Sequence, residues 1–147
     1  MLLLMLTLSI TAMDLTALLK QEEGFSQSVY KCSEGYNTIG YGHRCGANHH
    51  NVTKKEAEKI LVNDIAKAMK NVEKLVGKNA PREVKEIVAA MTFQIGYEGV
   101  SKFKNMLACI NKGDYKGASK EMLNSKWGKQ TPARAKRMAN LMAAIKK

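Results

Sequence analysis

The sequence predicts an α+β fold in which a small antiparallel sheet precedes a mainly helical remainder. Two strand-like runs, residues 28–31 and 36–43, flank a turn sequence that contains Gly35. After residue 53, apolar residues instead recur at helical spacing, and both prolines of the chain stand where helices are expected to begin. A chain of 147 residues can fold around a core without a metal or a disulfide.

The first helix is expected from Asp14 to about Glu23. The Asp14 side chain can accept hydrogen bonds from the free N–H groups of the first turn, and the leucines that follow form an apolar stripe. Gly24 is expected to end this helix. In the second strand run, Gly40 and Gly42 weaken the strand and indicate a close approach of the backbone to another group.

The remaining elements are expected to be helices. Residues 53–56, Thr-Lys-Lys-Glu, form a capping box ahead of a long amphipathic helix. Pro81 is expected to open the next helix and Gly96 to close it. Further helices are expected over residues 101–111, over 114–124, and from Thr131-Pro132 onwards. A long helix between a small β lobe and a helical lobe would leave a cleft, where substrates usually bind.

The first twelve residues, MLLLMLTLSITA, form a separate apolar extension before a single two-lobed domain over residues 13–147. They are too short for a spanning helix, which needs about 20 residues, and they lack the basic start of a standard export signal. Three interpretations stay open: a weak export signal or short anchor, a helix that docks on the domain, or an extension upstream of a start at Met13.

The charge points to an anionic partner. Lys and Arg total 24 against 13 acidic residues, which gives a net charge of +11. Such a protein is attracted to a polyanion: nucleic acid, an anionic membrane surface or an acidic polysaccharide. The composition, 45% hydrophobic and 25% charged, excludes a disordered chain.

The three cysteines, Cys32, Cys45 and Cys109, match no disulfide scaffold and no paired zinc motif. We expect reduced thiols in a chain made in a reducing cytosol, with Cys109 buried among apolar neighbours. The histidines around Cys45 have no standard zinc spacing, so neither a metal nor another cofactor is expected.

One constellation is suited to acid-assisted hydrolysis. Glu23 stands at a helix end, and Cys32 and Thr38 stand on the hairpin, in the spacing Glu, eight residues, Cys, five residues, Thr. A carboxyl group can protonate a leaving oxygen while polar groups opposite place a water molecule. The alternative is a solvated carboxylate at a helix end, which most such residues are.

Three segments resemble the phage-type (T4-like) lysozymes, or endolysins. They are EEGFSQSVYKCSEGYNTIGYGHR (22–44), MTFQIG with GVSKF (91–103), and SKWGKQTPARAKR (125–137), in the family's order. The resemblance covers about residues 13–137. It implies a lysozyme-like fold, and hydrolysis of the β-1,4 bond between N-acetylmuramic acid and N-acetylglucosamine in peptidoglycan.

By this resemblance, Glu23 matches the general acid and Thr38 the threonine that helps to hold the attacking water. Arg134 matches an arginine that orients the acid, and His43 a structural histidine that pairs with a carboxylate. Cys32 stands where the family more commonly has aspartate. It would act as a base or electrostatic partner when ionised, as a nucleophile, or only as a small turn residue.

The resemblance also implies residues that line the saccharide cleft, for which ordinary helix packing is the alternative. They are Glu34, Phe93, Gln94, Lys126 and Gln130. Trp127 is expected to be a core anchor. A disulfide between Cys32 and Cys45 would silence the enzyme until reduced, as in some exported relatives, provided that their Cα atoms lie within about 7 Å.

The motifs narrow the anionic partner to peptidoglycan, without nucleic acid and with membrane contact only through residues 1–12. We expect a monomer that is made in the cytoplasm of a host bacterium and acts on the cell wall, by an export route left open. Two alternatives remain: a catalytically weak peptidoglycan-binding module, and a cationic protein that disrupts membranes.

Overall fold

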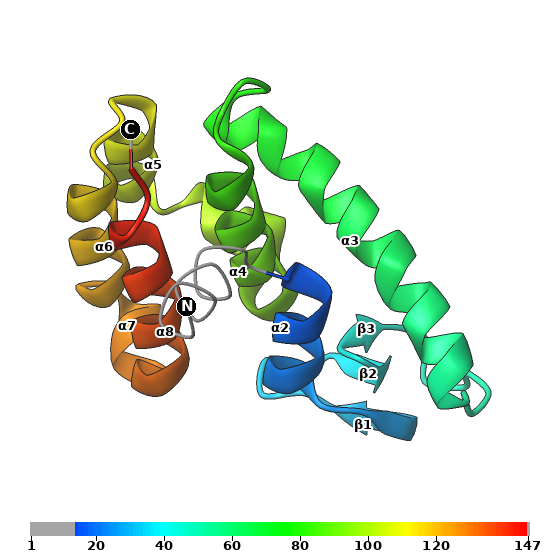
Figure 1. Ribbon diagram of the computed structural model, residues 1–147. Helices are drawn as coiled ribbons and strands as arrows, with labels where there is room; N and C mark the ends of the chain where they lie inside the picture. The colour runs from blue at the N-terminus through cyan, green and yellow to red at the C-terminus, as the bar shows by residue number, and fades with distance from the viewer. Residues whose placement is uncertain (1–13, 147) are drawn as a thin grey trace, which may run out of the picture. The chain divides into compact units, whose positions relative to one another are not determined.

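The computed structural model describes residues 14–146, so the apolar extension and its three interpretations lie outside the described residues. The described chain forms two compact units, residues 14–32 with 36–62, and residues 33–35 with 63–146. A three-stranded antiparallel sheet occurs in the first unit, and the other elements are helices (Figure 1). The predicted α+β class is confirmed. No helix within residues 14–146 is long and apolar enough to cross a membrane.

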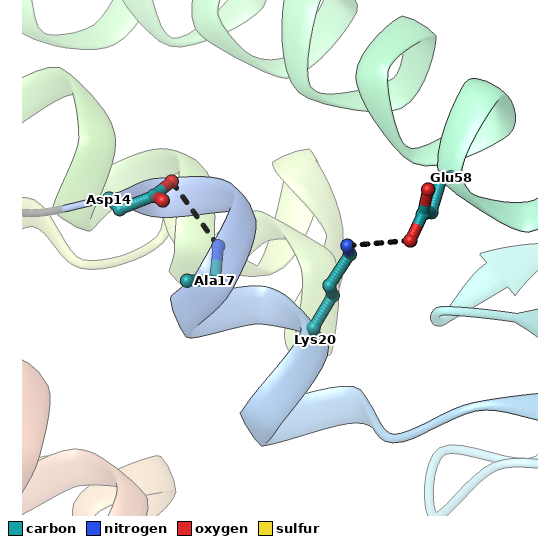
Figure 2. Close-up of polar contacts among 4 residues, drawn as sticks. All are labelled: Asp14, Ala17, Lys20 and Glu58. Atoms are coloured by element: carbon teal, nitrogen blue, oxygen red, sulfur yellow. Dashed lines mark hydrogen bonds and ion pairs between the residues drawn. The ribbon is translucent and has the colours of Figure 1, made fainter. Parts of the chain in front are cut away.

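Helix α2 (Leu15–Glu23) has the ends that the sequence predicts. The Asp14 carboxylate accepts a hydrogen bond from the backbone N–H of Ala17 at 3.3 Å (Figure 2). At the other end, Gly24 adopts φ 67° and its N–H donates to the carbonyl of Lys20 at 3.0 Å. Because glycine has no Cβ, this left-handed conformation is accessible there, and the chain can turn directly into the sheet.

The sheet consists of β1 (Ser26–Lys31), β2 (Asn37–Gly40) and β3 (His43–Arg44), in that order. The prediction of one strand over residues 36–43 was wrong. Gly40 and Gly42 both have positive φ, 64° and 73°, so the chain reverses between them. One run with strand propensity therefore folds into two antiparallel strands.

Helix α3 (Lys54–Val76) begins with the predicted capping box. The Thr53 hydroxyl group accepts from the N–H of Glu56, and the Glu56 carboxylate accepts from the N–H of Thr53, both at 3.1 Å. Within the first unit, Lys20 of α2 forms a 2.9 Å ion pair with Glu58 near the start of α3 (Figure 2). These contacts fix the N-terminus of α3 beside α2.

Helix α4 (Arg82–Ser101) opens after Pro81 as predicted, and Gly96 interrupts it. Gly96 has φ 77° and ψ 162°, which are not helical values, and helical structure resumes beyond it as far as Ser101. The prediction that Gly96 closes this helix is therefore confirmed, and a second, short helical segment follows it within α4.

Four shorter helices complete the second unit: α5 (Lys104–Asn111), α6 (Tyr115–Leu123), α7 (Lys126–Gln130) and α8 (Pro132–Ala143). Helix α6 packs against both α5 and α8. The sequence did not predict α7, which the Ser125 side chain caps by accepting from the N–H of Gly128. Thr131 does not cap α8 with its hydroxyl group, which instead donates to the carbonyl of Trp127. Cys109 is half-buried rather than fully buried.

The Lys85–Glu73 pair in the second unit predicts how its stability responds to acid. Lys85 Nζ lies 2.8 Å from the Glu73 carboxylate, and that hydrogen bond holds the pKa of Glu73 below its ordinary value. A carboxyl group with a depressed pKa in the folded state stabilises at neutral pH, and the stabilisation is lost as pH falls below about 4.5, the ordinary carboxyl value.

We therefore expect Glu73→Gln to lower the melting temperature by a few degrees at pH 7 and to differ less from the unmodified protein below pH 4.5. Thermal unfolding followed by circular dichroism across this range measures it. The exposed Glu98 supplies the control Glu98→Gln. An equal melting-temperature difference at pH 7 and pH 3.5 would contradict the prediction.

Candidate active site

The side chain of Glu23, the last residue of α2, lies directly against the backbone of Gly42. A Cβ atom at Gly42 would stand 2.8 Å from Cγ, 2.9 Å from Cδ and 3.1 Å from Oε2 of Glu23. Gly40 likewise approaches α3, because a Cβ there would lie 3.1 Å from the Cβ of Ala57. Both glycines therefore mark close backbone approaches, as the sequence predicted. At Gly42, the group approached is the candidate general acid.

The register of the sheet places Cys32 and Thr38 on one face. Thr38 pairs with Tyr30 on β1 and with Arg44 on β3. Just beyond β1, the N–H of Cys32 donates to the carbonyl of Tyr36 at 3.0 Å, which continues the same register. Directly opposed residues of antiparallel strands point to the same side, and alternate residues along a strand share a face. This face, which we call the Thr38 face, carries Tyr30, Cys32, Tyr36, Thr38 and Arg44.

The pKa of Tyr30 is affected both by Glu23 at the end of α2 and by Cys32 on the Thr38 face. Burial, followed by the negative charges of Glu23 and Cys32, raises the pKa of the Tyr30 hydroxyl group. Both acidic groups are therefore close enough to Tyr30 to act on its charge. Together with Thr38, which pairs with Tyr30, three of the predicted site residues lie around one tyrosine in the first unit.

The Thr38 side chain has a defined hydrogen-bonding role. It is only 2% exposed, and its hydroxyl group donates to the carbonyl of Tyr36 at 2.8 Å. A hydroxyl group has one proton to donate, so further partners of Thr38 Oγ1 must be donors. The oxygen can then accept a hydrogen bond from a water molecule, and this orientation leaves a lone pair of the water free to attack.

The regulatory disulfide between Cys32 and Cys45 is not compatible with this sheet. The N–H of Cys45 donates to the carbonyl of Asn37, so Cys45 pairs with Asn37 and shares the opposite face from Cys32. Two strand spacings of about 4.8 Å separate the cysteines, which places their Cα atoms about 10 Å apart. A disulfide needs less than about 7 Å, and the structure joins none of the three cysteines in a disulfide. Burial raises the pKa of the Cys45 thiol.

The second unit carries five of the other predicted residues. Phe93 and Gln94 lie half-buried on α4, Lys126 and Gln130 are exposed on α7, and Arg134 lies on α8. Arg134 Nη2 donates to the carbonyl of Ala90 at 3.5 Å. Their positions on these helices do not test whether they contact a glycan, so the roles expected for them stay predictions.

Gln94 has a partner that the sequence did not predict. Its side-chain oxygen accepts from the indole N–H of Trp127 at 2.8 Å. Trp127 is 5% exposed, and its ring stands edge-on to Phe103 with centroids 6.2 Å apart. The expectation that Trp127 is a core anchor is confirmed, and its hydrogen bond orients the Gln94 amide.

Glu34 and His43 belong to the surroundings of the sheet. Glu34 lies in the exposed turn between β1 and β2. His43 pairs with Ile39 on the face opposite Thr38, and its ring stands edge-on to His49 with centroids 6.4 Å apart. Within residues 14–146 no group of three or more His, Cys, Asp or Glu side chains is arranged to hold a metal ion.

Sequence reasoning missed Tyr30 and assigned no function to Arg44. Tyr30 stands two residues before Cys32, so strand alternation alone would have placed both on one face. Arg44 could not be assigned in the same way, because its position depends on the unexpected reversal at Gly42.

The family follows from comparison with known proteins. The model of the phage lysozyme family matches residues 20–143, which include all the site residues described above. The chain belongs to the phage lysozyme family. It is therefore a lysozyme-type glycoside hydrolase, and its small antiparallel sheet with surrounding helices agrees with the fold of such lysozymes.

Relatives of this lysozyme come from an amoeba and from phages. Probable T4-type lysozyme 1 of Dictyostelium discoideum is 30% identical over 85% of this chain and 91% of its own length. An endolysin of Acyrthosiphon pisum secondary endosymbiont phage 1 is 32% identical over 78% of this chain and 82% of its own length. Peptidoglycan hydrolase gp36 of Pseudomonas phage phiKMV is 28% identical over 85% of this chain, but over only 14% of its own length.

The contact between Glu23 and Gly42 predicts that Gly42→Ala impairs activity more than folding. The new Cβ would overlap the Glu23 side chain, which must rotate away, and a displaced catalytic group costs about a hundredfold in rate. The positive φ at residue 42 adds a stability loss of about 1–2 kcal/mol. Kinetics of cell-wall clearing and thermal unfolding measure the two effects.

A matched control separates backbone strain from displacement of Glu23. Gly77 also has a positive φ, 91°, but no atom lies within 4 Å of a Cβ built there. Gly77→Ala should therefore cost similar stability and keep its activity. If both variants lose activity equally, the support of Glu23 by Gly42 is wrong.

Proposed function

We propose that this lysozyme hydrolyses the β-1,4 bond between N-acetylmuramic acid and N-acetylglucosamine of peptidoglycan. Glu23 acts as the general acid, and Cys32 and Thr38 position or activate the attacking water. The observation that carries the proposal is the convergence of Glu23, Cys32 and Thr38 around Tyr30 in the first unit. Peptidoglycan is the substrate named for the relative from the Pseudomonas phage.

Glu23 supplies the proton in this mechanism. A glycosidic oxygen leaves as an alcohol only if it is protonated as the bond breaks, and a carboxylic acid held at a helix end can deliver that proton. Gly42 limits the rotation of the Glu23 side chain by direct contact. The proposed role of Arg134, to orient this carboxyl group, rests on the resemblance of residues 125–137 to the family.

Thr38 and Cys32 act on the opposite side of the bond. The Thr38 hydroxyl group, already donating to Tyr36, accepts a hydrogen bond from the attacking water, and the proton that this water loses on attack passes to solvent. Cys32 lies on the same face as Thr38, and its sulfur atom is the second contact to the attacking water. The Tyr30 hydroxyl group adds no negative charge beside Glu23, because its pKa lies above the ordinary tyrosine value of 10.0.

The remaining parts of the proposal concern the substrate and its place. The net charge of +11 favours retention on an anionic wall. The proposed glycan contacts are Glu34, Phe93, Gln94, Lys126 and Gln130, on the resemblance of their sequence segments to the family. The enzyme acts on the cell wall as a monomer and needs no cofactor, after synthesis in the cytoplasm of a host bacterium.

Glu23→Gln tests the general acid. The amide has the shape of the carboxyl group but no proton to give, so clearing of a cell-wall suspension should slow by about 10²–10⁴-fold. Turbidity loss measures the rate, and release of reducing sugar ends identifies the bond. Glu83→Gln, an exposed carboxyl group on α4, is the control and should clear at the normal rate.

Two outcomes of this experiment would favour other functions. Equal clearing by the Glu23→Gln variant and the unmodified protein would contradict the catalytic assignment and favour membrane disruption, which dye release from lipid vesicles would reveal. Binding to the wall without clearing by the unmodified protein would favour a binding module.

Cys32 variants test the second catalytic position. Cys32→Ala should lower kcat at least about tenfold, since it removes one contact to the water, whereas Cys32→Asp, the commoner family residue, should retain activity. Initial rates on soluble glycan fragments with and without reductant measure both variants. Cys109→Ala is the control for loss of a half-buried thiol. Unchanged activity of Cys32→Ala would remove Cys32 from the mechanism.

A further inference from the structure

An exposed cation–aromatic pair extends the Thr38 face. Tyr36 is 50% exposed, and the guanidinium carbon of Arg44 stands 3.9 Å from the centroid of its ring. Tyr36 and Arg44 are diagonal neighbours on β2 and β3, because Arg44 pairs with Thr38 two residues along. Stacking on the ring gives the long Arg44 side chain a preferred position before any ligand arrives.

The pair lies beside the residues proposed to handle the water. Tyr36 accepts from the backbone of Cys32 and from the hydroxyl group of Thr38, so its main chain contacts both positions. Its ring and the Arg44 guanidinium group point to the same side of the sheet as Cys32 and Thr38. A glycan bound over these residues would therefore meet the pair.

Arg44 has donors to offer such a ligand. Within residues 14–146 the structure gives Arg44 no ion-pair partner, whereas Lys20 and Lys85 are paired with Glu58 and Glu73. A guanidinium group stacked by its face keeps its N–H edges directed outward. Those edges match the two oxygens of a carboxylate.

We propose that Tyr36 and Arg44 form a subsite for a carboxylate carried by the muramic acid residue of the glycan. The proposal rests on the proposed function, and it names the part of the substrate that this face selects. Muramic acid carries its carboxylates on one substituent: the lactyl group when no peptide is attached, and the peptide stem when one is. N-acetylglucosamine has none, so the subsite would set which sugar lies on the Thr38 face.

Arg44→Gln tests the subsite on three soluble substrates: glycan fragments with peptide stems, stem-free fragments with free lactyl groups, and either fragment with its carboxylates converted to amides. We expect KM to rise about five- to thirtyfold on the carboxylate-bearing fragments, with kcat within twofold, and no change on the amidated ones. An effect on stem-bearing fragments alone identifies the stem as the source, and an effect on stem-free fragments identifies the lactyl group.

Matched variants separate recognition of the carboxylate from an effect of net charge and from a change in the structure. Lys116→Gln removes the same charge at an exposed position on α6 and should leave KM unchanged. Arg44→Lys keeps the positive charge but not the two parallel N–H donors of the guanidinium group. Its KM should lie between those of the unmodified protein and Arg44→Gln. Tyr36→Phe keeps the stacked ring and should resemble the unmodified protein, whereas Tyr36→Leu, which frees Arg44, should raise KM.

Calorimetric titration of the same fragments keeps this inference separate from the proposed function. If the unmodified enzyme cleaves no fragment yet binds those with carboxylates more tightly than Arg44→Gln does, the proposed reaction fails and the subsite stands. If Arg44→Gln changes nothing, or changes KM equally on charged and amidated fragments, the subsite is wrong. A fall in kcat on all substrates would likewise show a structural role for Arg44.

Discussion

The contact between the Glu23 side chain and the backbone of Gly42 is the constraint on which the first unit depends. It requires α2 to end at Glu23, which the left-handed Gly24 permits. It also requires the strand run to reverse at residues 40–42, because only that reversal brings a bare backbone against the carboxyl group. The same reversal creates β3 and so places Arg44 beside Thr38. The absence of a Cβ at Gly42 therefore permits both the close approach of Glu23 and the reversal that leads into β3.

The two faces of the sheet carry different kinds of side chain. On one face, the paired residues Tyr30, Thr38 and Arg44 bring hydroxyl groups and a cation together, near the thiol of Cys32. The other face includes Ile39, which is fully buried. Because side chains alternate along a strand, neither set can change face without a one-residue slip of the register. Such a slip would move the Thr38 hydroxyl group away from Cys32 and Arg44, so the polar face depends on this register.

The sequence predicted the features that local chemistry decides, and the structure added those that depend on backbone conformation. Asp14, Gly24 and the capping box at residues 53–56 were predictable because each acts within one turn of a helix. The reversal at Gly42 was not, because a glycine permits a left-handed conformation without requiring it. For the site, spacing gave the candidate acid and its partners, whereas the involvement of Tyr30 needed the strand register.

The presence of a thiol at residue 32 constrains the chemistry that this face can perform. A carboxyl group is a stronger acid than a thiol, so a protonated carboxyl group beside a thiolate is the less favoured of the two singly protonated states. A mechanism that required this state would use only a minor population of the enzyme. A neutral thiol avoids this requirement, since it can contact water beside the Thr38 hydroxyl group without ionising. The reaction then depends on the ionisation of one protein group, the Glu23 carboxyl group that delivers the proton. A site with two carboxyl groups must also keep one of them charged while the other stays protonated.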